Sequence, residues 1–136
     1  MLHSDTRRLS YNDTDPAGIL YYASWFPKME ALLSDFMYRN GYRQDQSLDA
    51  RGWTTVTRAT ECEYLAAARL FDEIRLELAI GAIGATSFQF AYRMVRTDDD
   101  VLVSRAKTTI VIVDSEQRAI RIPADFRRQL EDWAAA

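Results

Sequence analysis

The sequence predicts an α+β fold in which one long, largely buried helix packs on an antiparallel sheet. Two observations indicate this class. A single strand-like segment precedes one long apolar helical pattern, and at least four strand-like segments then follow one another without a second long helix. Strands that succeed one another through short turns pair antiparallel, and a helix outside that run covers one face of their sheet. Residues 1–136 show no repeat or linker, so we expect a single domain.

The first predicted elements are a strand over residues 6–11 and, after a turn, a helix from Ser24 to Arg39. The helix is indicated by apolar side chains that recur at helical spacing on one face. This face consists of Trp25, Met29, Leu32, Leu33 and Phe36, extended by Phe26 and Met37. Lys28, Asp35 and Arg39 are expected on the opposite side. Asn40-Gly41 is a left-handed cap signal that ends the helix.

After this helix, the spacing of apolar residues changes from the helical period to the alternation that is typical of strands. A polar connection or short helix is expected over residues 42–52, and a bend over residues 66–70. Alternating apolar and polar residues predict strands over residues 54–64, 72–83, 87–95 and 101–113. The acidic run at residues 98–100 is expected to form a solvated hairpin turn, and a short helix is expected over residues 123–133.

Composition limits the possible functions. Hydrophobic residues make up 48% and charged residues 27%, as in a soluble globular protein. The net charge of −3 argues against a general nucleic-acid binder, and no apolar run reaches membrane-spanning length. The N-terminus has no signal-peptide pattern, and the single cysteine fits a reducing compartment, so we expect a cytoplasmic protein.

The chain has one cysteine and one histidine, which restricts nucleophilic catalysis. Cys62 lies in an alternating strand pattern and is interpreted as a packing residue rather than a nucleophile. His3 lies near a terminus that we expect to be frayed. Ser-His-Asp and Cys-His mechanisms are therefore not expected, because His3 would have to supply the base.

A turn with two carboxylates, Asp13 and Asp15, directly precedes the helix. Asp15 stands before Pro16 and is therefore held in an extended conformation. Residue types alone leave two interpretations open. The segment can be a plain connecting turn, or its carboxylate can lie beside the N–H groups of the helix start, where it suits attack on an activated carbonyl.

A calcium loop was tested by spacing and rejected. Asp13, Asp15 and Gly18 match the first, third and sixth positions of an EF-hand. Ala17 occupies the fifth position, and Ser24 occupies the twelfth, where a carboxylate is required. We expect no metal and no cofactor.

The layout and the acidic turn together resemble the 4-hydroxybenzoyl-CoA thioesterase family of the hotdog fold, in which a curved antiparallel sheet wraps a long central helix. Residues 13–22, DTDPAGILYY, match the signature D-x-D-x-x-G-hydrophobic-hydrophobic-x-[HY] of that family. Residues 68–72, ARLFD, fall where the family has a P-A-R-L-D-D-like bend, although Ala67 replaces the usual proline. Residues 102–106 and 119–126 resemble the penultimate strand and the closing segment.

The resemblance implies roles for four residues. Asp15 matches the catalytic aspartate, which attacks the thioester carbonyl directly or activates a water. The backbone N–H of Tyr22 matches the oxyanion donor. Glu30 falls where aromatic-specific members carry an aspartate that contacts a substrate phenol, and Trp25 is a candidate lining residue of the acyl pocket. Helical geometry alone favours a solvated flank position for Glu30, whereas Trp25 can equally be a core residue.

The implied function is hydrolysis of an acyl-CoA thioester, with a 4-hydroxybenzoyl-like aromatic group as one candidate. The basic cluster that aromatic-specific members carry before a Ser-Phe pair is absent before Ser87-Phe88. CoA would then be held by Arg58, Arg69 or Arg105. Alternatively, an acyl carrier protein delivers the acyl or polyketide chain. A third hypothesis is a non-catalytic acyl-binding hotdog protein. A dehydratase is disfavoured because no suitable histidine exists.

The resemblance also implies assembly. In this family two subunits pair their sheets and share active sites. We therefore expect a homodimer or homotetramer, with an acyl thioester as the only other partner.

Overall fold

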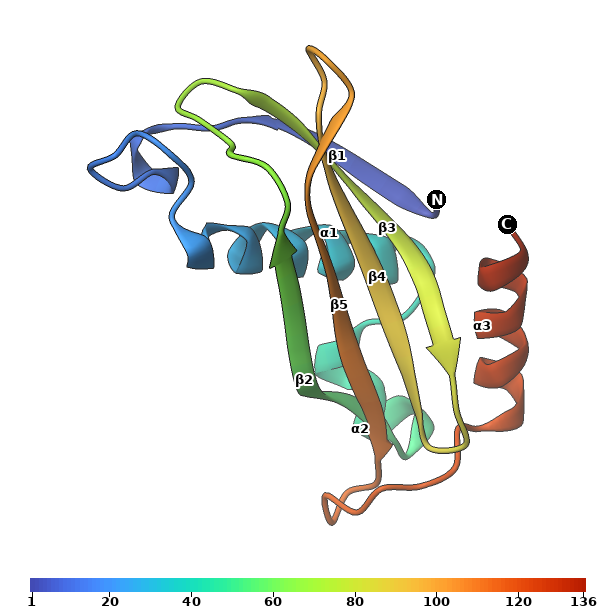
Figure 1. Cartoon of the computed structure of the whole chain (residues 1–136). Coiled ribbons are helices and arrows are strands. Elements are labelled where there is room, and N and C mark those ends of the chain that lie inside the picture. The colour runs from blue at the N-terminus through green and yellow to red at the C-terminus, as the bar shows by residue number, and fades with distance from the viewer.

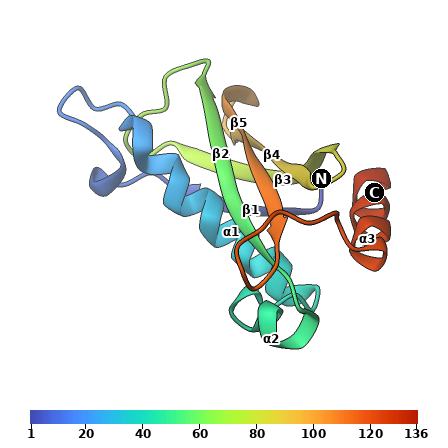
Figure 2. The same ribbon diagram turned by 90° about the horizontal axis from the view of Figure 1, so that it is seen from below.

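A five-stranded antiparallel sheet carries one long helix across one face (Figures 1 and 2). The computed structural model describes all 136 residues. Its elements are β1 (His3–Arg8), α1 (Trp25–Arg39), α2 (Ser47–Arg51), β2 (Thr54–Tyr64), β3 (Glu73–Ile83), β4 (Ser87–Arg96), β5 (Val101–Val113) and α3 (Ala124–Ala135). The sheet order is β1-β3-β4-β5-β2, with all pairs antiparallel. The predicted fold class is confirmed.

The core lies between α1 and the face of the sheet that it crosses. Alternate side chains of the three central strands point into it, which is the period-two pattern of a half-covered sheet. The buried residues of β3 and β4 are Ile74, Leu76, Leu78, Phe88, Phe90, Tyr92 and Met94. Apart from Phe26, the apolar face of α1 is buried as predicted, and α3 adds Phe126, Leu130 and Trp133 at helical spacing.

Helix α1 ends where the sequence indicates. The Asn40 side chain donates to the Phe36 carbonyl at 2.8 Å, and Gly41 follows with a positive φ of 84°. A left-handed residue of this kind costs little only for glycine, so the chain reverses here into the polar segment that contains α2.

The first strand is displaced from its predicted position. We expected it over residues 6–11, but β1 covers His3–Arg8. Leu9 leaves the strand and is fully buried, and its N–H donates to the Asp72 carbonyl at 2.9 Å. Ser10 and Asp13 then form a capping box that winds residues 11–13 into a single 3₁₀ turn. Burial of Leu9 and this local cap end the strand early.

Three further expectations need correction. His3 is not frayed, because it pairs with Leu78 and its ring bonds the Asp35 carboxylate at 2.7 Å. Lys28 does not lie on a solvated face, since only 13% of its side chain is exposed and its ammonium pairs with Asp13. Phe26, expected to extend the buried face of α1, is 38% exposed.

The later strands agree closely with their predicted limits, but the sheet leaves β2 at an edge. Much of β2 is exposed on both faces because α1 packs mainly against β1 and β3. A bulge at Arg58 shifts its pairing with β5. Cys62 is half-buried against the core, and burial raises the pKa of its thiol, which agrees with a packing role. No helix has the length and apolar character that a membrane crossing requires.

Candidate active site

The acidic turn forms a small hairpin that precedes α1. The Gly18 N–H donates to the Asp15 carbonyl at 2.9 Å, closing a turn with aspartate first and proline second. Gly18 has a φ of 77°, which favours glycine. Thr14 bridges Leu20 across the hairpin, and the Asp15 N–H donates to the Ile19 carbonyl at 3.0 Å. The local sequence thus folds residues 14–20 back on themselves.

A second segment fixes this hairpin in space. Ile19 forms a bridge with Arg69 in the connection between β2 and β3. The Leu20 N–H donates to the Ala68 carbonyl at 2.8 Å, and the Leu70 N–H donates to the Gly18 carbonyl at 3.2 Å. The bend at residues 66–70 therefore forms an extra pairing that holds the Asp15 turn against the sheet.

Asp15 is partly exposed, and only one of its two carboxylate oxygens has a hydrogen-bond partner within the chain. Its Oδ1 accepts the Ala17 N–H at 2.8 Å, which orients the carboxyl group. No hydrogen bond or ion pair within the chain occupies Oδ2. One oriented oxygen therefore remains available to a substrate or a water molecule, which is the geometry that a nucleophile or general base requires.

Asp13 braces the turn instead. Its carboxylate is buried and accepts the Ser10 N–H at 2.8 Å, and its Oδ1 pairs with the Lys28 ammonium. Burial alone would raise the Asp13 pKa, but the hydrogen bonds from Lys28 and Ser10 outweigh it and lower the pKa below its ordinary value. Its carbonyl accepts the Tyr21 N–H at 2.8 Å. Asp13 thus ties the hairpin to the start of α1.

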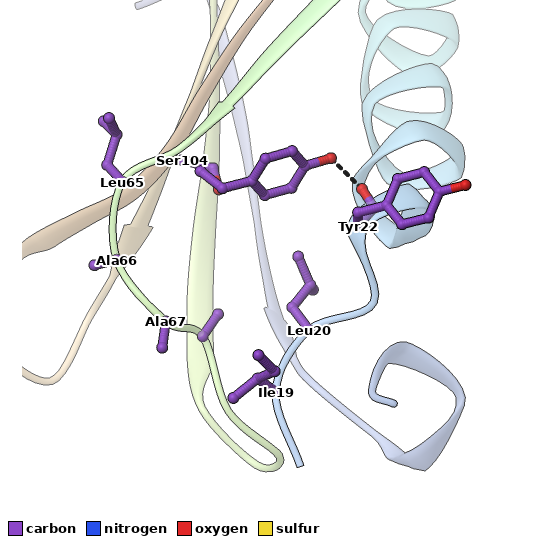
Figure 3. Close-up of a pocket in the computed structure, with 9 residues that line it drawn as sticks. Ile19, Leu20, Tyr22, Leu65, Ala66, Ala67 and Ser104 are labelled. Carbon is purple, nitrogen blue, oxygen red and sulfur yellow. Dashed lines mark hydrogen bonds between the residues drawn. The ribbon is translucent and has the colours of Figure 1, made fainter. Parts of the chain in front are cut away.

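The chain enters α1 through a 3₁₀ turn, Tyr22–Ser24. The first N–H groups of a helix have no partner within that helix, and they carry its positive dipole end. The Tyr64 hydroxyl, from the end of β2, donates to the Tyr22 carbonyl (Figure 3). Ser24 Oγ donates to the Asp13 carbonyl at 3.0 Å. Hydrogen bonds from Tyr64 and Ser24 thus hold the helix start from two sides.

An apolar cavity of about 430 Å³ opens beside this helix start (Figure 3). It lies between the hairpin and the connection from β2 to β3. Its lining residues are Ile19, Leu20, Tyr22, Tyr64, Leu65, Ala66, Ala67, Ala68 and Ser104. Asp15 is in the hairpin that forms one wall, although its side chain does not line the cavity.

A second cavity, of about 320 Å³, lies further along α1. Its lining residues are Phe26, Met29, Glu30, Thr57, Thr60, Tyr92 and Thr108. Glu30 is exposed, and its Oε1 accepts the Ser34 hydroxyl at 3.0 Å. The carboxylate thus stands at the margin of a cavity with several hydroxyl groups.

The four residues suggested by the sequence do not all meet in one chain. Asp15 and Tyr22 lie at the same end of α1, and Glu30 lies two helical turns away at the second cavity. Trp25 is fully buried, and its Nε1 donates to Ser104 Oγ at 2.9 Å. The indole therefore belongs to the core of the subunit and lines neither cavity.

The candidate CoA-binding arginines differ in their surroundings. Arg105 pairs with Glu63 at 3.2 Å on the outer face of the sheet. Arg58 lies at the bulge of β2 and Arg69 at the hairpin, and both are exposed and free of ion pairs. Arg69 is the one next to the Asp15 turn.

Four residues of these sites were not singled out from the sequence. Lys28 falls on the side of the helical pattern opposite the apolar face, which predicts a surface residue. Only the fold reveals its pairing with Asp13. Tyr64 lies at a strand end, where no pattern shows its contact with Tyr22. Ser104 and Thr108 did carry a signal, because they are polar residues at positions of β5 whose alternation predicts inward side chains.

Comparisons with known proteins define the class. Residues 9–130 match the sequence model of the Thioesterase-like superfamily. The acyl-CoA thioester hydrolase YbgC of Escherichia coli CFT073 is 33% identical over 107 residues, which are 79% of this chain and 78% of that protein. The chain belongs to the Thioesterase-like superfamily and is a thioester hydrolase of the hotdog fold.

Solved structures agree with this fold. A 1,4-dihydroxy-2-naphthoyl-CoA thioesterase from Synechocystis superposes with a TM-score of 0.81 at 18% identity, covering 96% of both chains. A Staphylococcus aureus protein solved in complex with CoA superposes with a TM-score of 0.84 at 16% identity, covering 99% of this chain and 85% of that one. At these identities the likeness concerns the fold.

Proposed function

We propose that this protein hydrolyses acyl-CoA thioesters and that Asp15 is its catalytic carboxylate. The observation that carries the proposal is the free Oδ2 of Asp15, oriented by the Ala17 N–H in a hairpin joined to the start of α1. This oxygen attacks the thioester carbonyl directly, or it removes a proton from a water that attacks. The YbgC relative, named as an acyl-CoA thioester hydrolase, supports the substrate class.

The start of α1 supplies the second half of the mechanism. Negative charge develops on the carbonyl oxygen when the thioester is attacked, and donors that are already in place stabilise it. In this proposal the backbone N–H of Tyr22 donates a hydrogen bond to that oxygen, and the helix dipole adds to the stabilisation. The thiolate of CoA then leaves, and water releases the acid if an acyl-Asp15 intermediate has formed.

The CoA and acyl ends of the substrate have different candidate contacts. Arg69 is unpaired beside the hairpin and can approach the phosphates of CoA, with Arg58 as a further cation. Delivery by an acyl carrier protein needs fewer such cations and remains the alternative. On the acyl side, we propose an aromatic group that runs along α1 towards Glu30, whose carboxylate accepts its hydroxyl.

The exposed edge of the sheet supports assembly into at least a homodimer, with a homotetramer as the larger form. Strand β2 is 11 residues long, has one free edge and leaves much of both faces exposed. Long unprotected edges pair readily with another chain. A second copy against β2 would cover the stripe of α1 that carries Tyr22, Phe26 and Glu30, and would close both cavities.

A panel of thioesters tests the function. Aryl-CoA, short and medium aliphatic acyl-CoA, and the same acyl groups on an acyl carrier protein are assayed by release of free thiol. We expect turnover of CoA thioesters that exceeds turnover of carrier-bound ones. Hydrolysis restricted to the carrier-bound forms would favour the alternative, and binding without hydrolysis would indicate a non-catalytic acyl-binding protein.

A further inference from the structure

Two aromatic side chains contact each other on the surface beside the hairpin that carries Asp15. The rings of Tyr11 and Phe71 meet edge to face, with their centroids 5.8 Å apart. Tyr11 is 75% exposed and Phe71 is 55% exposed. Single exposed apolar side chains are common, but two large rings in contact form an apolar surface that water solvates poorly. This aromatic pair lines neither of the two cavities described above.

Phe71 also has a backbone conformation that its residue type disfavours. The Asp72 N–H donates to the Arg69 carbonyl at 3.0 Å, which closes a turn with Phe71 at its third position. The φ of Phe71 is 69°, in the left-handed region where glycine or asparagine is usual and a bulky side chain is strained. The P-A-R-L-D-D-like bend that this segment resembles has an aspartate here. A strained and exposed phenylalanine is therefore a candidate functional residue.

The aromatic pair is connected to the hairpin through backbone pairing. Asp15 lies opposite Ile19 in the hairpin, and Ile19 forms a bridge with Arg69. At about 5 Å between adjacent strands, the backbone of Arg69 lies roughly 10 Å from that of Asp15, and Phe71 follows two residues later. The Phe71 N–H donates to the Leu9 carbonyl at 3.0 Å, which continues the pairing of β1 with β3. The dimer contact proposed at β2, the other edge of the sheet, does not include the pair.

Arg69 supplies a cation in the same turn. It is exposed and forms no ion pair within the chain, whereas Arg8, which donates to the Phe71 carbonyl at 2.9 Å, is paired with Glu73 at 3.4 Å. Exposed aromatic rings stack on the flat faces of nucleotide bases, and a free guanidinium binds phosphate oxygens. The turn therefore combines the two kinds of group that recognise a nucleotide.

On the basis of the acyl-CoA hydrolysis proposed above, we propose that Tyr11 and Phe71 bind the adenine base of CoA and that Arg69 binds its phosphates. The pantetheine arm has about thirteen bonds between its sulfur and the first phosphorus, the length of about four extended residues, or roughly 14 Å. A thioester held at Asp15 therefore brings the phosphates within reach of Arg69. A carrier-bound thioester has no adenine, so the aromatic pair selects CoA over a carrier protein.

The first experiment compares hydrolysis of benzoyl-CoA and of benzoyl-N-acetylcysteamine, which keeps the end of the pantetheine arm and lacks the nucleotide. The variants are Phe71→Asn, Tyr11→Ser and Arg69→Gln. Asparagine accepts a positive φ, so Phe71→Asn removes the ring without straining the turn. Tyr38→Ser is the matched control, because Tyr38 is 65% exposed near the opposite end of α1.

We expect Phe71→Asn and Tyr11→Ser to raise KM for benzoyl-CoA roughly tenfold, the scale of one lost base–aromatic stack, with kcat unchanged. Arg69→Gln should also raise this KM and should make it less dependent on salt. All three variants should cleave the N-acetylcysteamine thioester like the wild type, and Tyr38→Ser should change neither substrate. Equal effects on both thioesters, or a lower Tm of Phe71→Asn with an unchanged KM, would show a structural role and overturn the inference.

Binding without turnover separates this inference from the proposed function. Isothermal titration calorimetry uses adenosine 3′,5′-diphosphate as the nucleotide probe and pyrophosphate as the probe without a base. We expect the wild type to bind the nucleotide at least tenfold more tightly than pyrophosphate, and Phe71→Asn to lose this difference. Such binding without hydrolysis of any thioester would refute the proposed function and keep the inference. Equal binding of the two probes by the wild type would refute the inference, whatever the hydrolysis assays show.

Discussion

The Lys28 ammonium on the first full turn of α1 pairs with the carboxylate of Asp13, two residues before the proposed catalytic Asp15. Both side chains are almost inaccessible to solvent, with exposures of 13% for Lys28 and 9% for Asp13. Asp13 also caps its own turn through Ser10. The pair therefore joins helix α1 to the hairpin, which fixes the position of Asp15 relative to the helix start.

The first prediction concerns this brace. Asp13→Asn should destabilise the fold by about 2 kcal/mol, because it leaves the Lys28 charge poorly hydrated and unpaired. Urea unfolding measures the loss, and Lys28→Met together with Asp13→Asn should recover part of it. Additive losses in the double variant would show that the two side chains do not interact. In a folded Asp13→Asn protein, turnover should fall less than when Asp15 is changed.

The pH dependence of this effect has a defined sign. The pKa of Asp13 is lower in the folded protein than in the unfolded chain, where it is about 3.9. The contribution of this carboxylate to the free energy of unfolding is therefore complete above the unfolded pKa, and it is lost as the pH falls through the folded pKa. The stability difference between the wild type and Asp13→Asn should therefore be constant near neutral pH and shrink below about pH 4. A difference that grows on acidification would contradict the assignment.

Substitution of Asp15 should reduce turnover with little effect on stability, whereas substitution of Asp13 should mainly reduce stability. Asp15→Asn keeps the turn geometry, since the amide oxygen can still accept the Ala17 N–H, but it removes the free carboxylate oxygen. We expect kcat to fall roughly 10²-fold or more with little change in Tm, the scale of losing a positioned base or nucleophile. Near-normal turnover by a well-folded Asp15→Asn protein would rule out the catalytic assignment.

Tyr64 provides a test of helix-start positioning. Tyr64→Phe removes the hydrogen bond to the Tyr22 carbonyl and should lower kcat about fivefold, with a smaller effect on KM. Burial raises the pKa of Tyr64 to about 12, so its hydroxyl donates throughout the range from pH 5 to 9. The pH–rate profiles of the wild type and the variant should therefore have the same shape. A change of shape would instead indicate that Tyr64 transfers a proton.

Glu30 should influence the choice of substrate more than the rate of chemistry. We predict that hydroxylated aryl thioesters are cleaved faster than unsubstituted ones, because a substrate hydroxyl can donate to the Glu30 oxygen that Ser34 does not occupy. Glu30→Ala should narrow this difference while leaving kcat for unsubstituted substrates nearly unchanged. Equal kcat/KM for both substrates in the wild type would show that Glu30 is only a flank residue of α1.

Assembly can be tested at the free edge of the sheet. Light scattering should show at least a dimer. Val56→Lys places a charge on the exposed edge strand β2 and should weaken association, whereas Thr6→Lys on β1 serves as the matched control at the other edge. A stable wild-type monomer with full activity would refute the assembly proposal. Equal effects of the two substitutions would place the interface elsewhere.

The sequence by itself determined the helix, the later strands and the acidic turn. The apolar spacing of α1 and the alternation of β2 to β5 are local patterns, and each segment folds as its own pattern predicts because burial enforces the same period. The end of β1 was misjudged because Leu9 is held by a distant segment, residues 71–72, and no local signal reports that contact.

Only the tertiary structure decided which residues share a site. Lys28 has the local pattern of a solvated residue, yet the hairpin folds Asp13 onto it. The sequence predicts only a bend at residues 66–70, yet this segment pairs with the hairpin that carries Asp15. Thr108 and Glu30 are 78 positions apart in the sequence and line one cavity. These relations depend on contacts between segments that are distant in the sequence. The periodicity of a segment predicts which of its faces is buried, but it does not predict which other segment packs against that face.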